Sequence, residues 1–313
     1  MMQMLDHAAI DARLDWPALI AALRAAFAGN AITAPPRQTL TIDLPDGQTA
    51  SLLLMPAWEA GKAIGVKVVT FFPGNAAQGK ATINAGYLLF DGADGRMQAV
   101  LDGDSLTARR TAAASALAAD YLARPDARVL LVAGTGQLSE EAALAHSAVR
   151  RYDRVLIWGR TTDKAQQIVA RLKAQGLAAE TCLDLEAGAR GADVICTVTA
   201  STVPLIRGDW LRPGSHLDLI GAFKPDMREC DTQAIVQAQI FVDSRAGALL
   251  AGDLAQPLAA GAITDTDVLA DLAELVQGGH PGRRDATART VFKSAGMALE
   301  DLAAAMLAQD GSA

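Results

Sequence analysis

Three cationic residues occupy positions where a charge needs a partner. Lys67 lies between two valines in a strand-like run, Arg37 follows two rigid prolines, and Arg110 begins an alanine-rich helical run. Burying an unpaired ammonium costs roughly several kcal/mol, so Lys67 should face a partner or a cleft. One carboxylate needs several convergent donors, and three cations from separate segments suit that task. The alternative is that these residues have no ligand-binding role. Lys67 would then be a charge on an edge strand, and the two arginines would lie on the surface or in ion pairs.

A glycine-rich turn in the middle of the chain indicates a second kind of chemistry. The strand-like run 129–133 leads into this turn, and a helix is expected over about 138–150. The first glycine bends the chain, the second lets the backbone approach a pyrophosphate, and the helix N-terminus offers free N–H groups. Dinucleotide-binding turns usually carry three glycines in the pattern Gly-x-Gly-x-x-Gly. Ser139 stands in place of the third glycine and is small enough for the helix to pack closely against the strand. An ordinary strand-to-helix turn is the alternative. The residues expected to contact a dinucleotide are Gly134, Thr135, Gly136, Gln137 and Leu138.

The end of the next strand-like run, 155–158, bears on which dinucleotide is bound. An acid that binds the adenosine ribose normally stands here, whereas this chain has Gly159 and Arg160, with Thr161 and Lys164 behind. Arg160 can pair with a 2′-phosphate through a forked, charge-assisted contact, so we expect NADPH to be preferred and NADH to be possible. A solvated Arg160 would leave that choice open. Thr197, Val198 and Thr199 end the strand expected at 193–199. We expect them to contact the nicotinamide side of the cofactor; the alternative is that they are ordinary strand residues.

Composition and spacing argue against several other classes of protein. The net charge of −7 and a pI near 5.1 disfavour nucleic acid and anionic membranes as partners. No apolar run approaches the roughly 20 residues that span a bilayer, and no signal peptide is expected. The three cysteines are scattered and indicate reduced thiols in a cytoplasmic protein. The four histidines share no ligand spacing and no Cys-x-x-Cys occurs, so we expect no metal site.

The hydrophobic pattern divides the chain into two architectures. Up to about residue 110, strand-like runs around an Asp46-Gly47 turn predict an antiparallel unit with one or two helices, the first capped by Asp15. From Thr107 onward an alanine-rich helix is expected, followed by strands that alternate with helices. This alternation predicts an α/β fold with a Rossmann-type, doubly wound parallel sheet. Its strands are expected at 129–133, 155–158, about 179–182, 193–199, 216–221 and 239–243.

Over nearly its whole length the chain resembles the ornithine cyclodeaminase/mu-crystallin family. The resemblance rests on many short stretches that occur in the family's order. They are Pro36-Arg37, Gly65-Val66-Lys67, Arg109 to Ala113, the Gly134 turn, Trp158-Gly159-Arg160, Ala192-Asp193-Val194, Arg212 to His216, Ile220-Gly221-Ala222, Arg228-Glu229, Gly252-Asp253-Leu254, and Phe292 to Gly296 with Glu300-Asp301.

This resemblance implies an organisation and a set of roles. It implies a homodimer in which residues 1–115 with 291–313 form an α+β substrate-binding and dimerisation domain, while 116–290 form the NAD(P)-binding Rossmann domain. It also implies that Arg37, Lys67 and Arg110 hold a substrate carboxylate. Further contacts implied by it are Thr82 and Ser294 to the substrate and Thr111 to the cofactor.

One departure from the family pattern concerns the reaction. Ornithine cyclodeaminases of the family carry an aspartate just after the Gly-Gly or Gly-Ala that follows the fifth strand, where it handles the substrate amine. This chain carries Phe223 there. An aromatic ring cannot pair with an ammonium as a carboxylate does, so the chain looks most like the family's Δ1-pyrroline-2-carboxylate/Δ1-piperideine-2-carboxylate reductases.

Such a reduction assigns tasks to the residues named above. A cyclic imine with a carboxylate on its imine carbon accepts hydride once its nitrogen is protonated, so the site must bind the carboxylate and supply a proton. Arg37 and Arg110 would anchor, Lys67 would anchor and donate the proton, and Phe223 would form an apolar wall; a bound water is the alternative proton source. Ornithine cyclodeamination, an open-chain amino-acid dehydrogenase of the alanine or iminosuccinate type, and a non-catalytic mu-crystallin-like binding protein remain alternatives.

Overall fold

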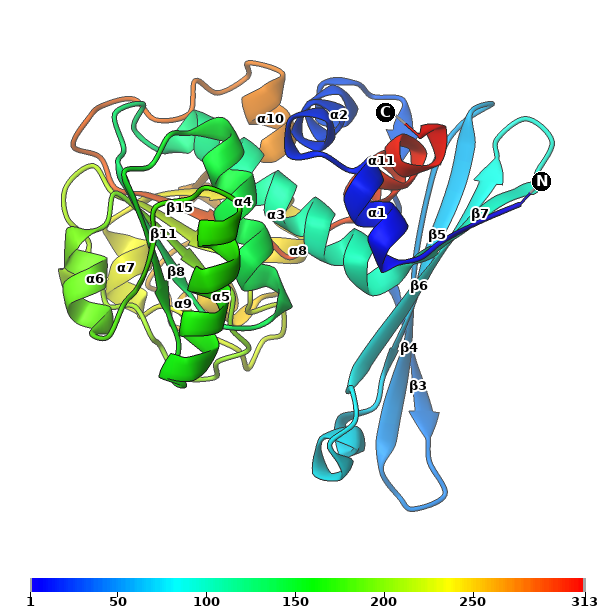
Figure 1. Ribbon diagram of the computed structural model, residues 1–313, viewed down its shortest axis with the longest axis horizontal. Helices are drawn as coiled ribbons and strands as arrows, with labels where there is room; N and C mark the ends of the chain where they lie inside the picture. The colour runs from blue at the N-terminus through cyan, green and yellow to red at the C-terminus, as the bar shows by residue number, and fades with distance from the viewer. Residues whose placement is uncertain (1, 312–313) are drawn as a thin grey trace. The chain divides into compact units, whose positions relative to one another are not determined.

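The computed structural model describes residues 2–311, apart from the side chain of Ala76, and divides into two compact units (Figure 1). The first unit runs to Arg110 and resumes at Met297; the second spans Thr111–Gly296. The sequence places these boundaries at 115 and 291, so residues 111–115 and 291–296 belong to the second unit instead. The later segment does so because the strand that contains residue 291 hydrogen-bonds inside the sheet of the second unit.

The first unit is built on a seven-stranded sheet of order β1-β7-β6-β5-β4-β2, with β3 paired to β4. All pairs are antiparallel except β1 with β7, and the Asp-Gly hairpin joins β3 to β4 as the sequence predicts. The strands are β1 (Gln3–Leu5), β2 (Ile32–Thr33), β3 (Gln38–Asp43), β4 (Thr49–Glu59), β5 (Ala63–Phe71), β6 (Ile83–Asp91) and β7 (Met97–Asp102).

Helices of the first unit cover the part of this sheet that carries Lys67. Asp15 caps the helix α2 by accepting from Ala18 N, as the sequence predicts. The C-terminal helix α11 packs on α2, β4 and β5, and this contact brings Asp301 to Lys67. The helices and the 3-10 turn are α1 (His7–Arg13), α2 (Trp16–Ala28), η1 (Pro73–Gln78) and α11 (Ala298–Asp310).

The helix α3 (Gly103–Leu122) carries the chain from the first unit into the second. It begins earlier than the alanine-rich pattern near Thr107 indicates. The cause is a cap: Asp102 accepts a hydrogen bond of 2.8 Å from the backbone of Ser105, which satisfies one of the free donors of the first turn. Asp102 is therefore the cap of this helix.

The second unit contains an eight-stranded, wholly parallel sheet of order β10-β9-β8-β11-β12-β15-β13-β14. The chain builds outward from β8 to β10 and then returns to the other side of β8, so the order reverses between β8 and β11. This confirms the doubly wound fold. The strands are β8 (Val129–Ala133), β9 (Arg154–Trp158), β10 (Ala179–Thr181), β11 (Val194–Thr197), β12 (His216–Leu219), β13 (Gln239–Val242), β14 (Val268–Asp271) and β15 (Thr290–Lys293).

Two hydrophobic cores lie on the two faces of this sheet. Side chains of neighbouring residues alternate between them: Leu130 and Val132 pack in one core and Leu131 in the other. The first core includes residues of α4 and α5, and the second includes residues of α6, α7 and α9. The remaining elements of the unit are α4 (Gln137–Val149), α5 (Thr162–Ala174), α6 (Leu185–Gly191), η2 (Gly208–Trp210), α7 (Thr232–Val236), α8 (Arg245–Ala248), α9 (Gly252–Ala259), η3 (Asp265–Asp267) and α10 (Leu272–Val276).

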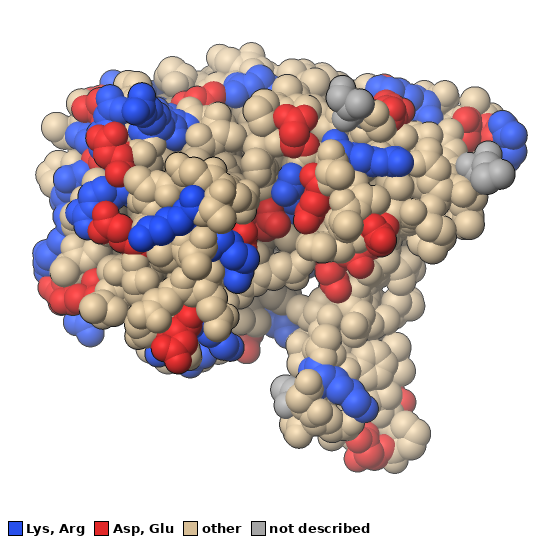
Figure 2. Space-filling model, in the orientation of Figure 1, with Lys and Arg blue, Asp and Glu red and all other residues tan. Residues whose placement is uncertain are grey.

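The surface carries charges of both signs. On the face drawn in Figure 2, lysine and arginine side chains are interspersed with aspartate and glutamate. Within residues 2–311, no helix is both long and apolar enough to cross a membrane.

Candidate functional site

A cavity of about 660 Å³ opens at the carboxyl ends of β8, β9 and β11, next to the point where the strand order reverses. Open parallel sheets bind their ligands at this position. Most of the residues that the sequence assigns to the cofactor contribute to its wall. The lining residues are Gly134, Thr135, Gly136, Trp158, Gly159, Arg160, Thr161, Lys164, Val198 to Val203, and Leu205.

The glycines of this cavity are required by close packing. Gly134 has a φ of +139°, and an added Cβ would lie 2.6 Å from Val198 Cγ2. A Cβ on Gly159 would overlap the side chain of Thr135. The helix α4 then starts at Gln137 with no side chain capping its first turn, so its N–H groups are available to a pyrophosphate. Turn, helix N-terminus and cavity together fit a dinucleotide.

Four residues assigned to the cofactor lie outside this wall. Leu138 packs against the hydrophobic core, and Gln137 is exposed at the start of α4. Thr197 is fully buried and its Oγ1 donates to the carbonyl of Asp218, while Thr111 is buried within α3. Conversely, the loop 200–205 was missed, although the loop after a central parallel strand normally borders the cleft.

The first unit assembles a buried cluster of two cations and two carboxylates. Lys67 Nζ on β5 lies 2.9 Å from Asp301 Oδ1, and Arg110 Nε on α3 lies 2.8 Å from the same oxygen. Arg110 Nη1 also donates to Glu300 Oε2 at 2.7 Å. A weaker contact of 3.4 Å joins Lys67 Nζ to Thr107 Oγ1. The sequence predicts that Lys67 needs a partner, and Asp301 is that partner.

The surroundings of Lys67 lower the pKa of its ammonium group toward neutral pH. Burial, with the charge of Arg110, lowers the pKa of Lys67 from 10.5 to about 8, while Asp301 and then Glu300 oppose the fall. Burial disfavours ionisation of Asp301, but Arg110 and Lys67 hold the pKa of its carboxyl below the usual range. An amine that is mostly protonated at neutral pH, and close to losing its proton, can act as a general acid.

Tyr87 lies opposite Lys67 on β6 and was missed. It is fully buried, and its hydroxyl has no hydrogen-bond partner among residues 2–311. A Cβ on Gly65 would overlap this hydroxyl, so the glycine before Val66 makes room for the tyrosine ring. Only the strand register reveals this pairing.

Arg37 and Thr82 lie at opposite ends of the strands in the first unit. Arg37 is half-buried just before β3 and, by register, stands level with the Met55–Lys67 pair. Thr82 stands level with Phe72, five residues along the chain from Lys67. At about 3.3 Å per strand residue, Thr82 lies roughly 16 Å from Lys67, so one chain does not bring these two together.

Phe223 and Ser294 belong to the second unit. Phe223 is half-buried after the end of β12, with Lys224 Nζ 5.7 Å from its ring centroid. Ser294 is only 1% exposed, and its hydroxyl donates to Asp243 Oδ2 at 3.1 Å. That hydroxyl therefore has a structural partner.

One further buried cluster joins polar side chains that are far apart in the sequence. His146 Nε2 lies 3.0 Å from Asp218 Oδ2, Ser115 donates to the same oxygen, and Cys196 Sγ lies within 4.8 Å of both ligand atoms. His146, Cys196 and Asp218 could each offer a ligand atom to a metal. Because they already hydrogen-bond to one another, the cluster is explained without an ion, and the absence of a metal stays a prediction.

The parallel sheet and its glycine-lined cavity define a Rossmann-type protein that binds a dinucleotide. Within that class, the chain belongs to the ornithine cyclodeaminase/mu-crystallin family, whose model matches residues 2–312. This confirms the resemblance drawn from the sequence.

Three known proteins show how close the similarity is. A Δ1-pyrroline-2-carboxylate reductase of Paracoccus denitrificans is 40% identical over 304 residues, covering 96% of this chain and 94% of that protein. The structure of Thermococcus litoralis Δ1-pyrroline-2-carboxylate reductase in complex with NADH and L-proline matches with a TM-score of 0.91 and 29% identity, covering 99% and 97% of the two chains. An archaeal alanine dehydrogenase dimer with bound NAD matches with a TM-score of 0.90 and 27% identity, covering 99% and 95%. This chain is accordingly an NAD(P)H-dependent oxidoreductase.

Proposed function

We propose that this chain reduces a cyclic ketimine, converting Δ1-pyrroline-2-carboxylate to L-proline and Δ1-piperideine-2-carboxylate to L-pipecolate. The observation that carries the proposal is the buried pair of Lys67 and Arg110 on Asp301, in a chain that has Phe223 where a deaminase of the family has an acid. The similarity to two pyrroline-2-carboxylate reductases supports the same reaction.

The bound cofactor would supply a hydride to the imine carbon. The protein's own residues then have three tasks: to hold the carboxylate, to place the ring, and to deliver a proton to the imine nitrogen. Lys67 and Arg110 are the cations we assign to the substrate carboxylate, with Arg37, just before β3, level with Lys67 by strand register. Lys67 Nζ, with a pKa of about 8, is the group we assign as proton donor. Phe223 offers an apolar surface to the carbon ring.

We propose NADPH as the preferred cofactor and NADH as an accepted one. Arg160, Thr161 and Lys164 are exposed in the cavity wall at the end of β9, and residues 159–162 there include no acid. A 2′-phosphate would meet two cations here, whereas Asp163, the acid between them in the sequence, does not line the cavity. Similar proteins bind NADH and NAD, which supports acceptance of the unphosphorylated cofactor.

A homodimer forms part of the proposal. All six residues of β3 are exposed, including Leu40 and Ile42. An edge strand with apolar side chains is prone to pair or pack with another chain, so a second copy covering it would remove that liability. The archaeal neighbour is described as a dimer, which is consistent with this.

A second candidate is an open-chain amino-acid dehydrogenase, which the similarity to the archaeal alanine dehydrogenase favours. Both reactions begin with a carboxylate next to a C=N bond. They differ because the open-chain imine must first form from a keto acid and ammonia. Requirement for ammonia therefore separates them.

The test is oxidation of NADPH and NADH by the purified protein with each cyclic ketimine, with pyruvate plus ammonia, and without substrate. We expect fast turnover of at least one cyclic ketimine without ammonia. The Lys67→Ala variant should lose about 10²-fold or more in kcat/KM while its affinity for NADPH stays unchanged. Lys62→Ala, at the exposed β4–β5 turn, is the matched control. No turnover of any cyclic ketimine would refute the proposal, and NADPH binding without any turnover would favour a binding protein.

A further inference from the structure

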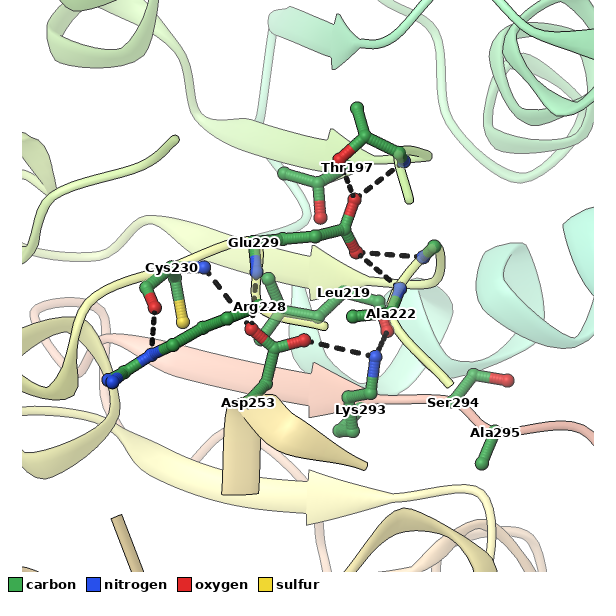
Figure 3. Close-up of polar contacts among 12 residues, drawn as sticks. Thr197, Leu219, Ala222, Arg228, Glu229, Cys230, Asp253, Lys293, Ser294 and Ala295 are labelled. Atoms are coloured by element: carbon green, nitrogen blue, oxygen red, sulfur yellow. Dashed lines mark hydrogen bonds and ion pairs between the residues drawn. The ribbon is translucent and has the colours of Figure 1, made fainter. Parts of the chain in front are cut away.

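Three charged side chains are wholly buried beside the exits of β11, β12 and β15 in the second unit, and the proposed reaction leaves them without a role. They are Glu229, Asp253 on α9 and Lys293 on β15, each 0% exposed (Figure 3). Burying two carboxylates and one ammonium carries a large desolvation cost. We therefore ask which backbone segments the hydrogen bonds of these three side chains hold in place.

The carboxylate of Glu229 ties two strand exits together. Its Oε1 accepts from Thr199 N at 2.6 Å and from Thr199 Oγ1 at 2.8 Å, just after β11. Its Oε2 accepts from Gly221 N at 2.7 Å and from Ala222 N at 3.1 Å, just after β12. Four donors thus converge on one side chain, which is close to the full capacity of a carboxylate.

The two exits are in close contact where Glu229 holds them. A Cβ on Gly221 would overlap the backbone of Thr199, so only glycine allows this approach. Thr199 forms part of the cavity wall, and Phe223 follows Ala222 directly. Any movement of the carboxylate would therefore displace both the cavity wall and the aromatic side chain.

These exits lie on the reacting side of the cofactor site. In a doubly wound sheet the dinucleotide straddles the point where strand order reverses, here between β8 and β11. The adenosine half belongs to the turn at Gly134 and the loop at Arg160, on β8 and β9. The nicotinamide half of a bound dinucleotide would then lie over the exits of β11 and β12, which Glu229 joins.

The remaining two charges hold Glu229 in place. Asp253 Oδ1 accepts from Glu229 N at 2.7 Å and from Cys230 N at 3.2 Å, and its Oδ2 lies 3.1 Å from Lys293 Nζ. Lys293 Nζ also donates to the carbonyl of Leu219 at the end of β12, at 3.1 Å. Figure 3 shows these contacts leading from Lys293 through Asp253 to the segment that carries Glu229.

We infer that Glu229 is a positioning residue that fixes the β11 and β12 exits as a rigid seat for the nicotinamide ring, with Asp253 and Lys293 as its support. The inference rests on the proposed function in so far as it takes the bound cofactor to be a reacting nicotinamide. It adds a residue that touches neither substrate nor cofactor and acts through Thr199 and Ala222.

The test compares two ligands that share the adenosine half. In Glu229→Gln, one oxygen becomes an NH₂ group that faces a backbone N–H donor, so at least one backbone hydrogen bond is lost at unchanged size. By calorimetric titration we expect NADPH to bind about 10-fold more weakly, while 2′,5′-ADP, which lacks the nicotinamide, binds within about twofold of the wild type. Glu274→Gln, in an exposed capping box, is the matched control and should change neither affinity.

Two outcomes would overturn the inference: equal weakening of both ligands, which indicates a merely structural role, or no weakening of either. If the glutamine variant does not fold, Thr199→Val removes one hydroxyl bond to Oε1 and should reproduce the contrast at about threefold. In whichever variant folds, kcat with the cyclic ketimine should fall more than KM changes. If the wild type turns over no ketimine, the proposed function fails, whereas the contrast between the two ligands still decides the role of Glu229.

Discussion

Replacing Asp301 with asparagine should shift the pH dependence of the reaction. Asp301 is fully buried and its Oδ1 accepts from both Lys67 and Arg110. The amide keeps the shape and one acceptor but removes the negative charge. Because Asp301 raises the pKa of Lys67 against burial and Arg110, its loss must lower that pKa below about 8.

The size of the shift follows from the geometry. Two unit charges 2.9 Å apart interact by about 6 kcal/mol at an effective dielectric constant of about 20, or about four pKa units, as an upper bound. Water entry and the remaining amide acceptor reduce this, so we expect a fall of about two units, to about 6. Protonated Lys67 would then drop from about nine-tenths to about one-tenth at pH 7, and kcat/KM by about tenfold.

The assay is the pH profile of kcat/KM for the cyclic ketimine. A wild-type alkaline limb near pH 8 should move to about pH 6 in Asp301→Asn. A limb that came from the substrate would be the same in both proteins, so an unmoved limb in a folded variant refutes Lys67 as proton donor. Asp94→Asn, in an exposed turn, is the control. Since breaking a buried pair costs about 3–5 kcal/mol, folding is checked first, and Glu300→Gln offers a milder variant with a smaller shift in the same direction.

Three further predictions concern the second unit. Arg160→Ala should raise KM for NADPH about tenfold and spare NADH, which steady-state kinetics with both cofactors will show; equal effects would remove the 2′-phosphate argument. Gly159→Ala should displace Thr135 and weaken cofactor binding about tenfold in a fluorescence titration, and unchanged affinity would contradict the packing argument. Burial lowers the pKa of His216 to about 3, so between pH 6.5 and 3 the unfolded state binds more protons and stability falls as pH falls. From pH 7 to pH 5 this contributes a loss of about 2 kcal/mol, which should be absent in His216→Asn when urea unfolding is compared at the two values.

Local patterns in the sequence predict much of the fold. The Asp46-Gly47 turn, the cap at Asp15 and the strand–turn–helix at Gly134 depend on neighbouring residues, and the structure has all three. The cation that needed a partner at Lys67 could also be recognised, because a charge among valines is costly wherever it lies.

Contacts between distant segments could not be read in the same way. Nothing near Lys67 indicates that its partner lies at residue 301, and nothing near Glu229 indicates that it binds the backbone at Thr199 and Gly221. Their pairing depends on which helix packs on which strand. The family pattern marked both acids as recurring residues, but only geometry gave them a task.

The placement of β15 bears on how the protein is made. This strand enters the middle of the parallel sheet, between β12 and β13, although all other strands of that sheet precede it in the chain. Directly after it, α11 returns to the first unit and delivers Asp301 to Lys67. Residues 290–310 therefore complete both units. A nascent chain that still lacks them would have a gap in the parallel sheet of the second unit and would leave Lys67 without Asp301. Both units thus reach their native contacts only after residues 290–310 have been synthesised, and until then the chain depends most on chaperones.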